Sequence, residues 1–480
     1  MMQPVAASLI DGVERRSSAV REVRDPGDRD TVLGQVCLAD VETAKEAIDS
    51  AEKAAQAWGA TPAPRRGRVL FEAAQQLDAR KADLARLLTR EEGKTLNESV
   101  FEVDRSINLF RFYGALCFKL GGKTLPSNDP NSYIYTVREP LGVVGVVTPW
   151  NFPLSIPAWK IAPALAAGDA VVFKPASQTP LMAKELVYAL LAAGLPKGVL
   201  NMVLGLGSVV GDTLVASAKV RAVSFTGSSE TGRHINTQAG QRMLRLQLEL
   251  GGKNALVVMD DADIDLAVEL AAKGAFGLTG QACTAASRLL VQQGIASDLL
   301  RKLVLRSSGM VVGHGLETGV EVGPLSSEDQ FYKVRRYIEI GKEEADLVAG
   351  GGVARTPKKG FYVSPTIFTD VAPEDRIFQE EIFGPVLSVT TFRDLGDAIN
   401  LVNSASYGLT AGIVTRSHAN VATFASKADA GVIRVNKPLP GLELQVPYGG
   451  FKDSGNDQYK EMGEEALDFY TRTKAVYVGY

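Results

Sequence analysis

The sequence predicts an α/β protein with two mostly parallel β-sheets, each covered by helices on both faces. The first observation is that short apolar runs alternate with segments of helical periodicity between residues 141 and 239. Strands of a parallel sheet are buried on both faces and joined by helices, which produces this pattern. The second observation is that the alternation restarts near Gly251 with the run NALVVM. The third is the length of 480 residues, which accommodates two to four structural units.

The first quarter of the chain is predicted to be mostly helical. Apolar residues at helical spacing predict a helix over 41–58, and the pattern recurs over 65–92 and 98–120. A short strand pair is expected near 9–11 and 20–23. The segment SYIYTVREP, which begins at Ser132, alternates apolar and polar side chains like a strand that touches solvent.

Buried strands and helices then follow one another. Strands are predicted over 141–148, 170–174, 199–204 and 222–226, and helices over 156–167, 180–193, 209–218 and 230–239. In the second half, strands are predicted for NALVVM, 288–291, LVAGG, TIFTDV and VLSVTTF, with a helix over 264–276. The run GGVARTPKKG is expected to be an exposed loop.

Composition disfavours several classes of function. The formal net charge of −3 is spread without long runs of one sign, so neither nucleic acid nor a membrane surface is an expected partner. The N-terminus lacks the pattern of a signal peptide, and we expect a cytoplasmic protein. Three cysteines form no CxxC pair and three histidines are isolated, so no metal site is expected. Acid–base chemistry would then rest on a carboxylate or a lysine.

Ligands of parallel sheets bind beyond the carboxyl ends of the strands, and two motifs fall there. GLGSVVG lacks the spacing of a dinucleotide fingerprint, and its glycines also suit an ordinary turn. FTGSSETG is the better anion site, because Gly227 and Ser228 lead into a helix N-terminus, although a simple Ser cap gives the same pattern. Lys174 ends a buried strand, where it is either solvated or in contact with phosphate or ribose.

Two polar residues lie in rigid or apolar surroundings. PWNFP holds Asn151 between prolines, so its amide is either a fixed donor or an ordinary turn residue. LELGG ends an apolar strand with Glu249, which is either a solvated strand end or a base with a tunable pKa.

Cys283 differs from the other two cysteines. Cys37 and Cys117 lie in apolar surroundings typical of buried, inert thiols. In GQACTAASR, small neighbours leave the sulfur of Cys283 reachable, as a nucleophile requires. The scarcity of histidine makes Glu249 the leading candidate for its base.

Seven motifs in order carry a family resemblance: PWNFP, KPAS, FTGSSETG, LELGGKN, GQACTAASR, EEIFGPV and PYGGFKDSG. The chain resembles the aldehyde dehydrogenase superfamily over nearly its whole length. The resemblance implies a Rossmann-like dinucleotide-binding domain (1–119 and 140–249), an α/β catalytic domain (250–450) and a small β oligomerisation element (120–139 and 467–480). It also implies a homodimer or homotetramer.

The resemblance implies roles for individual residues. The implied catalytic residues are Cys283, Glu249, Asn151 and Lys160. The implied cofactor contacts are Thr148, Trp150, Lys174, Ser177, Gly227, Ser228, Gly251, Glu381 and Phe383. The implied substrate contacts are Arg105 and Phe152, and no metal is implied.

The implied reaction is NAD- or NADP-dependent oxidation of an aldehyde to the free acid. Cys283 forms a thiohemiacetal and then a thioester, Asn151 and the Cys283 N–H hold the oxyanion, and Glu249 activates the hydrolytic water. Three alternatives stay open: a CoA-acylating member of the family, a cysteine thioesterase or hydrolase without nicotinamide, and a catalytically silent binding protein.

Two departures from the family pattern refine the prediction. Ser177 stands where NAD-preferring members often carry a glutamate, so NADP acceptance is expected. Arg105 stands where relatives often carry an apolar residue, which predicts a carboxylate-bearing semialdehyde or a sugar-acid aldehyde as substrate. Alternatively, Arg105 reaches solvent or bridges to Asp104 or Glu102. The pattern GLELQVPYGGFKDSG also resembles dehydrogenases of α-ketoglutarate semialdehyde.

Overall fold

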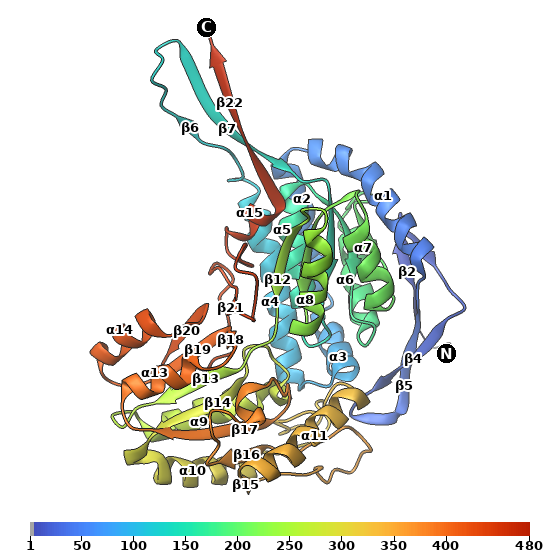
Figure 1. Cartoon of the computed structure of the whole chain (residues 1–480). Helices are drawn as coiled ribbons and strands as arrows, with labels where there is room; N and C mark the ends of the chain where they lie inside the picture. Colours follow the sequence, from blue (N-terminus) through green and yellow to red (C-terminus); the bar gives the residue numbers. More distant parts are fainter. Residues whose placement is uncertain (1–3) are drawn as a thin grey trace.

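Two seven-stranded sheets and a projecting antiparallel arm organise the chain (Figure 1). The structure is a computed structural model that describes residues 4–480; residues 1–3, which open the first predicted domain, lie outside the described residues. Parallel pairing dominates both large sheets, so the predicted α/β class is confirmed.

The first sheet is built from strands of the first half of the chain. Its order is β12 (Arg245–Glu249), β11 (Val220–Thr226), β8 (Val143–Val147), β9 (Ala170–Lys174), β10 (Leu200–Met202), β2 (Ser8–Ile10) and β3 (Val13–Arg15). The strands from β12 to β10 are parallel, and β2 and β3 add an antiparallel edge.

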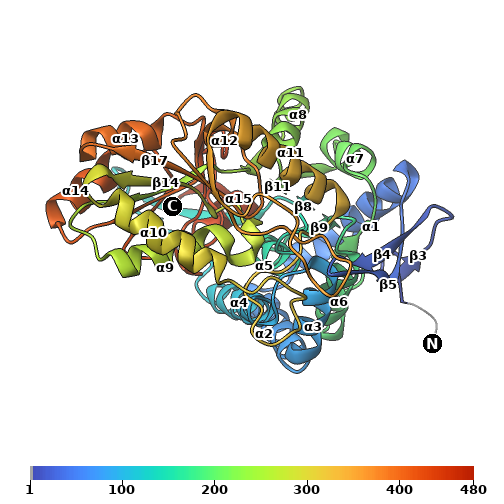
Figure 2. The same ribbon diagram turned by 90° about the horizontal axis from the view of Figure 1, so that it is seen from below.

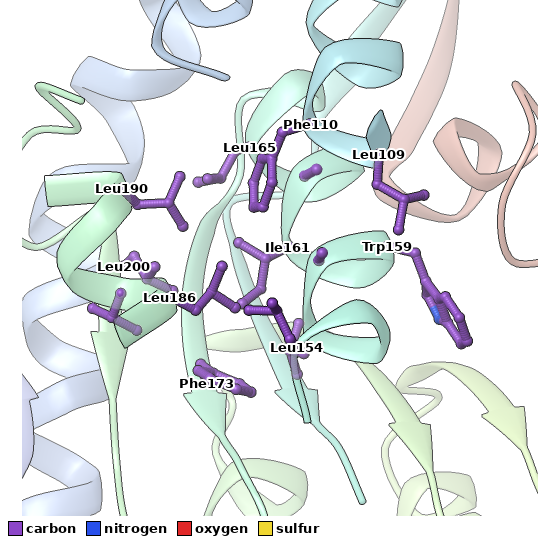
Figure 3. Close-up of a cluster of buried hydrophobic side chains, with 14 of the residues drawn as sticks. Leu109, Phe110, Leu154, Trp159, Ile161, Leu165, Phe173, Leu186, Leu190 and Leu200 are labelled. Atoms are coloured by element: carbon purple, nitrogen blue, oxygen red, sulfur yellow. The ribbon is translucent and has the colours of Figure 1, made fainter. Parts of the chain in front are cut away.

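Side chains of these strands alternate between two cores, as the two-residue repeat of a strand requires. Val144 and Phe173 face a core shared with α2 (Ala63–Asp78), α3 (Lys81–Glu92), α4 (Leu96–Leu116), α5 (Ser155–Ala167) and α6 (Pro180–Ala192). Figure 3 shows Phe173 of β9 close to Ile161 of α5 and Leu186 of α6 in this core. Val143 and Val172 face the opposite core, beneath α1 (Val41–Ala60), α7 (Asp212–Ala216) and α8 (Ser229–Gly240).

The second sheet has its own pair of cores. Its order is β15 (Asp346–Ala349), β16 (Thr366–Thr369), β17 (Val386–Phe392), β14 (Ala286–Gln292), β13 (Asn254–Val258), β19 (Thr410–Val414) and β20 (Val432–Val435). Helices α9 (Ile264–Phe276) and α10 (Ala296–Ser308) cover one face. Helices α11 (Glu328–Glu344), α12 (Arg376–Gln379), α13 (Leu395–Asn403) and α14 (His418–Lys427) cover the other. Figure 2 shows the elements of this sheet grouped apart from those of the first.

The arm is a three-stranded antiparallel sheet that extends away from both large sheets (Figure 1). Strand β7 (Ser132–Pro140) pairs with β22 (Thr471–Gly479) in a register that joins Pro140 to Thr471, and β6 (Thr124–Leu125) completes the sheet. Helix α15 (Ala466–Tyr470) leads directly into β22. The arm exposes large apolar side chains, among them 73% of Tyr477 and 44% of Tyr133.

Small elements complete the fold. Near the N-terminus, β1 (Val5–Ala6), β5 (Asp28–Cys37) and β4 (Val20–Asp25) form a second three-stranded sheet, and β18 (Tyr407–Gly408) pairs with β21 (Phe451–Lys452). In the part of the chain that the structure describes, no helix has the length and apolarity needed to cross a membrane, and no group of three or more His, Cys, Asp or Glu side chains is placed to hold a metal ion.

Four local expectations require correction. The helical pattern of 65–92 belongs to two helices, α2 and α3, because the chain turns at Ala79 and Arg80. Helix α4 starts before the predicted residue, because Thr95 and Glu98 form a capping box. The predicted helix 209–218 is a π-helical turn, Gly207–Gly211, followed by the short α7. The strands near 9–11 and 20–23 do not pair with each other: β2 pairs with β3 and β10, and β4 pairs with β5.

Candidate active site

The carboxyl ends of four parallel strands are aligned at one edge of the first sheet. Register places Val147 beside Lys174 and Thr226 beside Glu249. Thr148 follows β8 directly; its hydroxyl and that of Thr226 are buried without a hydrogen-bond partner among the described residues. Buried polar atoms normally have partners, so these two hydroxyls fit a site that a ligand completes.

Lys174 is the last residue of β9, and Ser177 follows three residues later. Lys174 is buried, its Nζ donates to the Pro175 carbonyl at 2.9 Å, and burial lowers the pKa of its ammonium to about 8. The Ser177 hydroxyl donates to the Gly205 carbonyl at 3.1 Å. Arg21 donates to the Ser177 carbonyl at 2.7 Å. The Arg21 guanidinium therefore lies at the backbone of Ser177, and Lys174 precedes Ser177 by three residues; among the described residues neither cation has a carboxylate within salt-bridge distance.

The loop after β11 leads into the N-terminus of α8. Gly227 has no room for a side chain, because a Cβ atom there would collide with the ring of Phe225. Ser228 is the N-cap of α8, with its hydroxyl accepting from the Thr231 N–H at 3.3 Å. Ser228 is exposed, so the free N–H groups of the first helical turn are accessible to an anion.

Glu381 links the second half of the chain to the end of the first sheet. Its carboxylate accepts from the Gly252 N–H at 2.9 Å, and burial raises its pKa. A side chain at Gly251 would collide with this carboxylate, and one at Gly252 would collide with the Cys283 carbonyl. Phe383 has left-handed backbone geometry, with φ of 62°. Its ring packs edge-on against that of Trp150, with the two ring centroids 5.5 Å apart.

Cys283 lies in the turn just before β14. Asn254 fixes the turn by donating to the Cys283 carbonyl at 2.7 Å and to the Ala285 carbonyl at 2.8 Å. Cys283 stays partly exposed while Ala282 and Thr284 are buried. Its sulfur lies 3.3 Å from the hydroxyl of Tyr448, and burial raises the pKa of the thiol to about 12. Attack by this thiol therefore requires a base.

Asn151 is buried against the Cys283 loop. One N–H of its amide donates to the Gln281 carbonyl at 3.0 Å, and its second N–H has no protein acceptor within the described residues. The backbone N–H of Cys283 likewise donates to none of the described groups. The Asn151 amide and the Cys283 backbone N–H are therefore two free donors beside the segment that carries the sulfur.

Glu249 is buried at the end of β12. It accepts from the Gly450 N–H at 3.3 Å. Burial, and then the negative charge of Glu461, raise the pKa of this carboxyl well above its ordinary value, while the Lys160 ammonium opposes the shift. The raised pKa makes Glu249 a stronger base than an ordinary carboxylate.

Lys160 belongs to a buried network beneath Glu249. Its ammonium pairs with Glu461 and donates to the Ser224 hydroxyl at 2.7 Å. The other carboxylate oxygen of Glu461 accepts from the indole of Trp159 at 2.7 Å. Lys160 is thus paired with a carboxylate.

The two predicted substrate contacts, Arg105 and Phe152, each lie beside a group of opposite character. The guanidinium of Arg105 donates to the Leu442 carbonyl and to the Met462 sulfur, and it lies 5.7 Å from the ring of Trp159. The ring of Phe152 lies 4.2 Å from the ammonium of Lys94.

Neither acidic neighbour of Arg105 on its helix bridges to it. Asp104 pairs with Lys81 at 2.6 Å and Glu102 pairs with Lys94 at 2.6 Å. The alternative in which Arg105 bridges to Asp104 or Glu102 is therefore wrong.

Sequence reasoning missed Tyr448, Glu461 and Lys94. The one available signal was for Glu461: Lys160 lies on a wholly buried helix, and a buried ammonium calls for a carboxylate partner. Tyr448 lies in PYGGFKDSG, but a tyrosine in a glycine-rich loop does not indicate which atom it contacts.

Comparison with known proteins agrees with this geometry. The model of the aldehyde dehydrogenase family matches residues 13–476. The chain is 53% identical over 459 residues to 2,5-dioxopentanoate dehydrogenase of Saccharolobus solfataricus, covering 95% of each chain. It is 44% identical to the α-ketoglutarate semialdehyde dehydrogenase of Haloferax volcanii, covering 98% of this chain and 97% of that one.

Solved structures show the same fold. Betaine aldehyde dehydrogenase of Staphylococcus aureus in complex with NAD+ superposes with a TM-score of 0.95 at 35% identity, over 99% of this chain and 95% of that one. A structure from Burkholderia cenocepacia described as a putative aldehyde dehydrogenase gives a TM-score of 0.96 at 36% identity, over 100% and 98%. The match over nearly the whole length, in sequence and in structure, confirms the resemblance carried by the seven motifs: the chain belongs to the aldehyde dehydrogenase family.

Proposed function

We propose that this chain oxidises an aldehyde with a distal carboxylate group to the free acid, with NAD or NADP as the oxidant. The observation that carries the substrate class is Arg105. Its guanidinium is largely buried, burial lowers its pKa to about 10, and no carboxylate among the described residues lies within salt-bridge distance. A desolvated guanidinium is stabilised by an anion, and a carboxylate is its natural bidentate partner.

The position of Arg105 relative to the nucleophile supports this assignment. The sulfur of Cys283 contacts the hydroxyl of Tyr448, and the centroid of the Tyr448 ring lies 6.3 Å from that of Trp159. The guanidinium of Arg105 lies over the ring of Trp159. Two relatives are named for 2,5-dioxopentanoate and α-ketoglutarate semialdehyde, which are two names for an aldehyde with a carboxylate at its other end. A carboxylate of this kind would complement the positive charge of Arg105.

Cys283 is the proposed nucleophile. Its thiol proton passes to a base, for which Glu249 is the candidate, and the sulfur bonds to the aldehyde carbon while the carbonyl oxygen takes the negative charge. The free N–H groups of Asn151 and Cys283 are the proposed donors to this oxygen. Each such donor contributes about 3–4 kcal/mol to the transition state.

The residues at the end of the first sheet fit a dinucleotide. Lys174 is buried without a carboxylate partner, the N-terminus of α8 is accessible at Ser228, and Glu381 is held by Gly252. A bound nicotinamide dinucleotide supplies the acceptor for the hydride that leaves the aldehyde carbon. Trp150 and Phe383, which contact each other edge-on, limit where its ring can lie.

Hydrolysis completes the proposed reaction. Glu249 first releases the thiol proton to solvent. The ionised carboxylate then takes a proton from water, the hydroxide adds to the thioester carbon, and the carbon–sulfur bond breaks to release the acid and the thiolate. The raised pKa of Glu249 suits this role, because a carboxylate with a raised pKa takes a proton from water more readily than an ordinary carboxylate does.

We further infer that NADP is accepted. Ser177 contributes no negative charge, Arg21 donates to its carbonyl, and Lys174 precedes it by three residues. A 2′-phosphate beside these three residues would be attracted by the two cations and would face no carboxylate from them.

The arm supports a homodimer or homotetramer. Tyr133, Leu125 and Tyr477 are large apolar residues exposed on this small sheet, and exposed apolar patches commonly mark protein interfaces.

The test is a panel of aldehydes assayed with both cofactors. Wild type, Arg105→Met and Cys283→Ala are compared on aldehydes with and without a terminal carboxylate. The product is identified as the free acid or the acyl-CoA. Arg105→Met should lower kcat/KM for carboxylated aldehydes about 10²-fold, the value of a lost charged hydrogen-bond pair, and leave neutral aldehydes within a few-fold. Equal losses for both classes would reject the proposed substrate, and activity in Cys283→Ala would reject the proposed nucleophile.

A further inference from the structure

Tyr448 places its phenolic oxygen 3.3 Å from the sulfur of Cys283. Tyr448 is 2% exposed, and within the described residues neither its hydroxyl nor the sulfur has another hydrogen-bond partner. A buried hydroxyl without a partner is unfavourable, so this contact is an element of the site.

The position of Tyr448 is fixed from two sides. Its backbone N–H and carbonyl pair with the carbonyl and N–H of Glu461, both at 2.6 Å. Glu461 is itself held by Trp159, whose ring is tilted against that of Tyr448. The hydroxyl is therefore aimed at the sulfur by the same buried network that surrounds Lys160.

The direction of the hydrogen bond follows from the chemistry of the two groups. A thiolate carries no proton and can only accept. Burial raises the pKa of Tyr448 well above its ordinary value, so the phenol keeps its proton. Whenever Cys283 is ionised, Tyr448 is the donor.

We propose that Tyr448 is a catalytic residue that donates a hydrogen bond to the Cys283 sulfur and stabilises its thiolate form. The inference rests on the proposed function, in which this sulfur is the nucleophile. No proton is transferred. When the sulfur bonds to the aldehyde carbon, its electron pair enters the carbon–sulfur bond and the hydrogen bond weakens.

The same contact acts a second time during hydrolysis. Hydroxide adds to the thioester carbon, the carbon–sulfur bond breaks, and its electron pair returns to the sulfur. The leaving thiolate again accepts from Tyr448. The hydroxyl thus assists both formation and release of the covalent intermediate.

The test is the pH dependence of Cys283 alkylation by iodoacetamide in wild type and Tyr448→Phe. Loss of a hydrogen bond to a charged acceptor should raise the thiol pKa by about one unit, which leaves about tenfold less thiolate below the midpoint. A thiolate of higher pKa is intrinsically more reactive by about threefold per unit. Alkylation at neutral pH should therefore be about threefold slower in the variant.

Two controls separate this effect from general damage. Tyr362→Phe removes the hydroxyl of another buried tyrosine, which donates to the Gly27 carbonyl at 2.9 Å, and its profile should match wild type. Cys283→Ala gives the background from Cys37 and Cys117. Coincident profiles for Tyr448→Phe and wild type would overturn the inference.

Failure of the inference and failure of the proposed function give different results. If wild type reduces cofactor with aldehyde, Cys283→Ala does not, and Tyr448→Phe is alkylated like wild type, only the role of Tyr448 falls. If Cys283→Ala keeps the oxidation activity, the proposed function falls whatever the alkylation profiles show.

Discussion

The ammonium of Lys94 lies 2.7 Å from the backbone carbonyl of Asn151, the proposed oxyanion donor. The same ammonium pairs with Glu102, whose second oxygen accepts from the N–H groups of Leu154 and Ser155 at the start of α5. One buried ion pair thus fixes both ends of the segment 151–155.

Lys94→Met should destabilise the protein and impair catalysis together. Removing one member of a buried pair leaves the carboxylate of Glu102 uncompensated, which costs about 3–5 kcal/mol. Urea unfolding monitored by circular dichroism measures the loss, and kcat reports the displacement of Asn151.

Lys81→Met is the matched control, because its partner Asp104 lies on α4 like Glu102, but the Lys81–Asp104 pair is partly exposed. It should cost at most about 1 kcal/mol. An equal loss of unfolding free energy in the two variants would show that burial of the Lys94–Glu102 pair does not determine its contribution.

Asn151→Ala should lower kcat about 10²–10³-fold while KM changes little, because the lost N–H acts mainly in the transition state. Steady-state kinetics with the preferred aldehyde measure this. The unfolding midpoint must also be recorded, because the amide holds the Gln281 carbonyl. A kcat within a few-fold of wild type would exclude Asn151 as an oxyanion donor.

The acid limb of the kcat profile should move in opposite directions when Lys160 and Glu461 are replaced. Burial raises the pKa of Glu249, Glu461 raises it further, and Lys160 lowers it. Hydrolysis needs the ionised base, so activity is lost as pH falls through this pKa. Glu461→Gln should move the limb to lower pH, and Lys160→Met to higher pH, each by about one unit.

The measurement is kcat against pH for the two variants and wild type, restricted to variants whose circular dichroism matches wild type. Shifts of the same sign would show that Glu249 is not the group that controls the limb.

Ser177→Glu should discriminate against NADP. A carboxylate facing a 2′-phosphate adds like-charge repulsion, which lowers kcat/KM for NADP by about tenfold or more. NAD lacks this phosphate and should be affected much less. Ser177→Gln, of similar size but neutral, is the control, and an equal effect of both variants would show that bulk rather than charge is responsible.

Sequence reasoning reached the groups that end strands or interrupt apolar runs. Lys174 and Glu249 stand out locally, because a buried strand followed by proline or glycine marks the residue at its end, and Cys283 stands out because its neighbours are small. The alternation in SYIYTV predicted a strand there, and the family resemblance implied that this segment and the C-terminal segment form one small β element.

Sequence reasoning could not identify contacts between residues that are distant along the chain. Tyr448 and Cys283 are 165 positions apart, and Lys160 and Glu461 are 301 apart. Periodicity reports which face of an element is buried, but it does not report which other element covers that face. The network beneath Glu249 therefore required coordinates.

Glu249 ends a strand of the first sheet, whereas Cys283 precedes a strand of the second, and only Leu250 to Lys253 separate β12 from β13. The proposed base and nucleophile therefore belong to separate sheets, and Cys283 also packs against a core of the first sheet, so their relative placement depends on the surfaces between the sheets. Mild denaturant that loosens this junction should silence turnover before either core melts, so inactivation would precede the loss of helical signal.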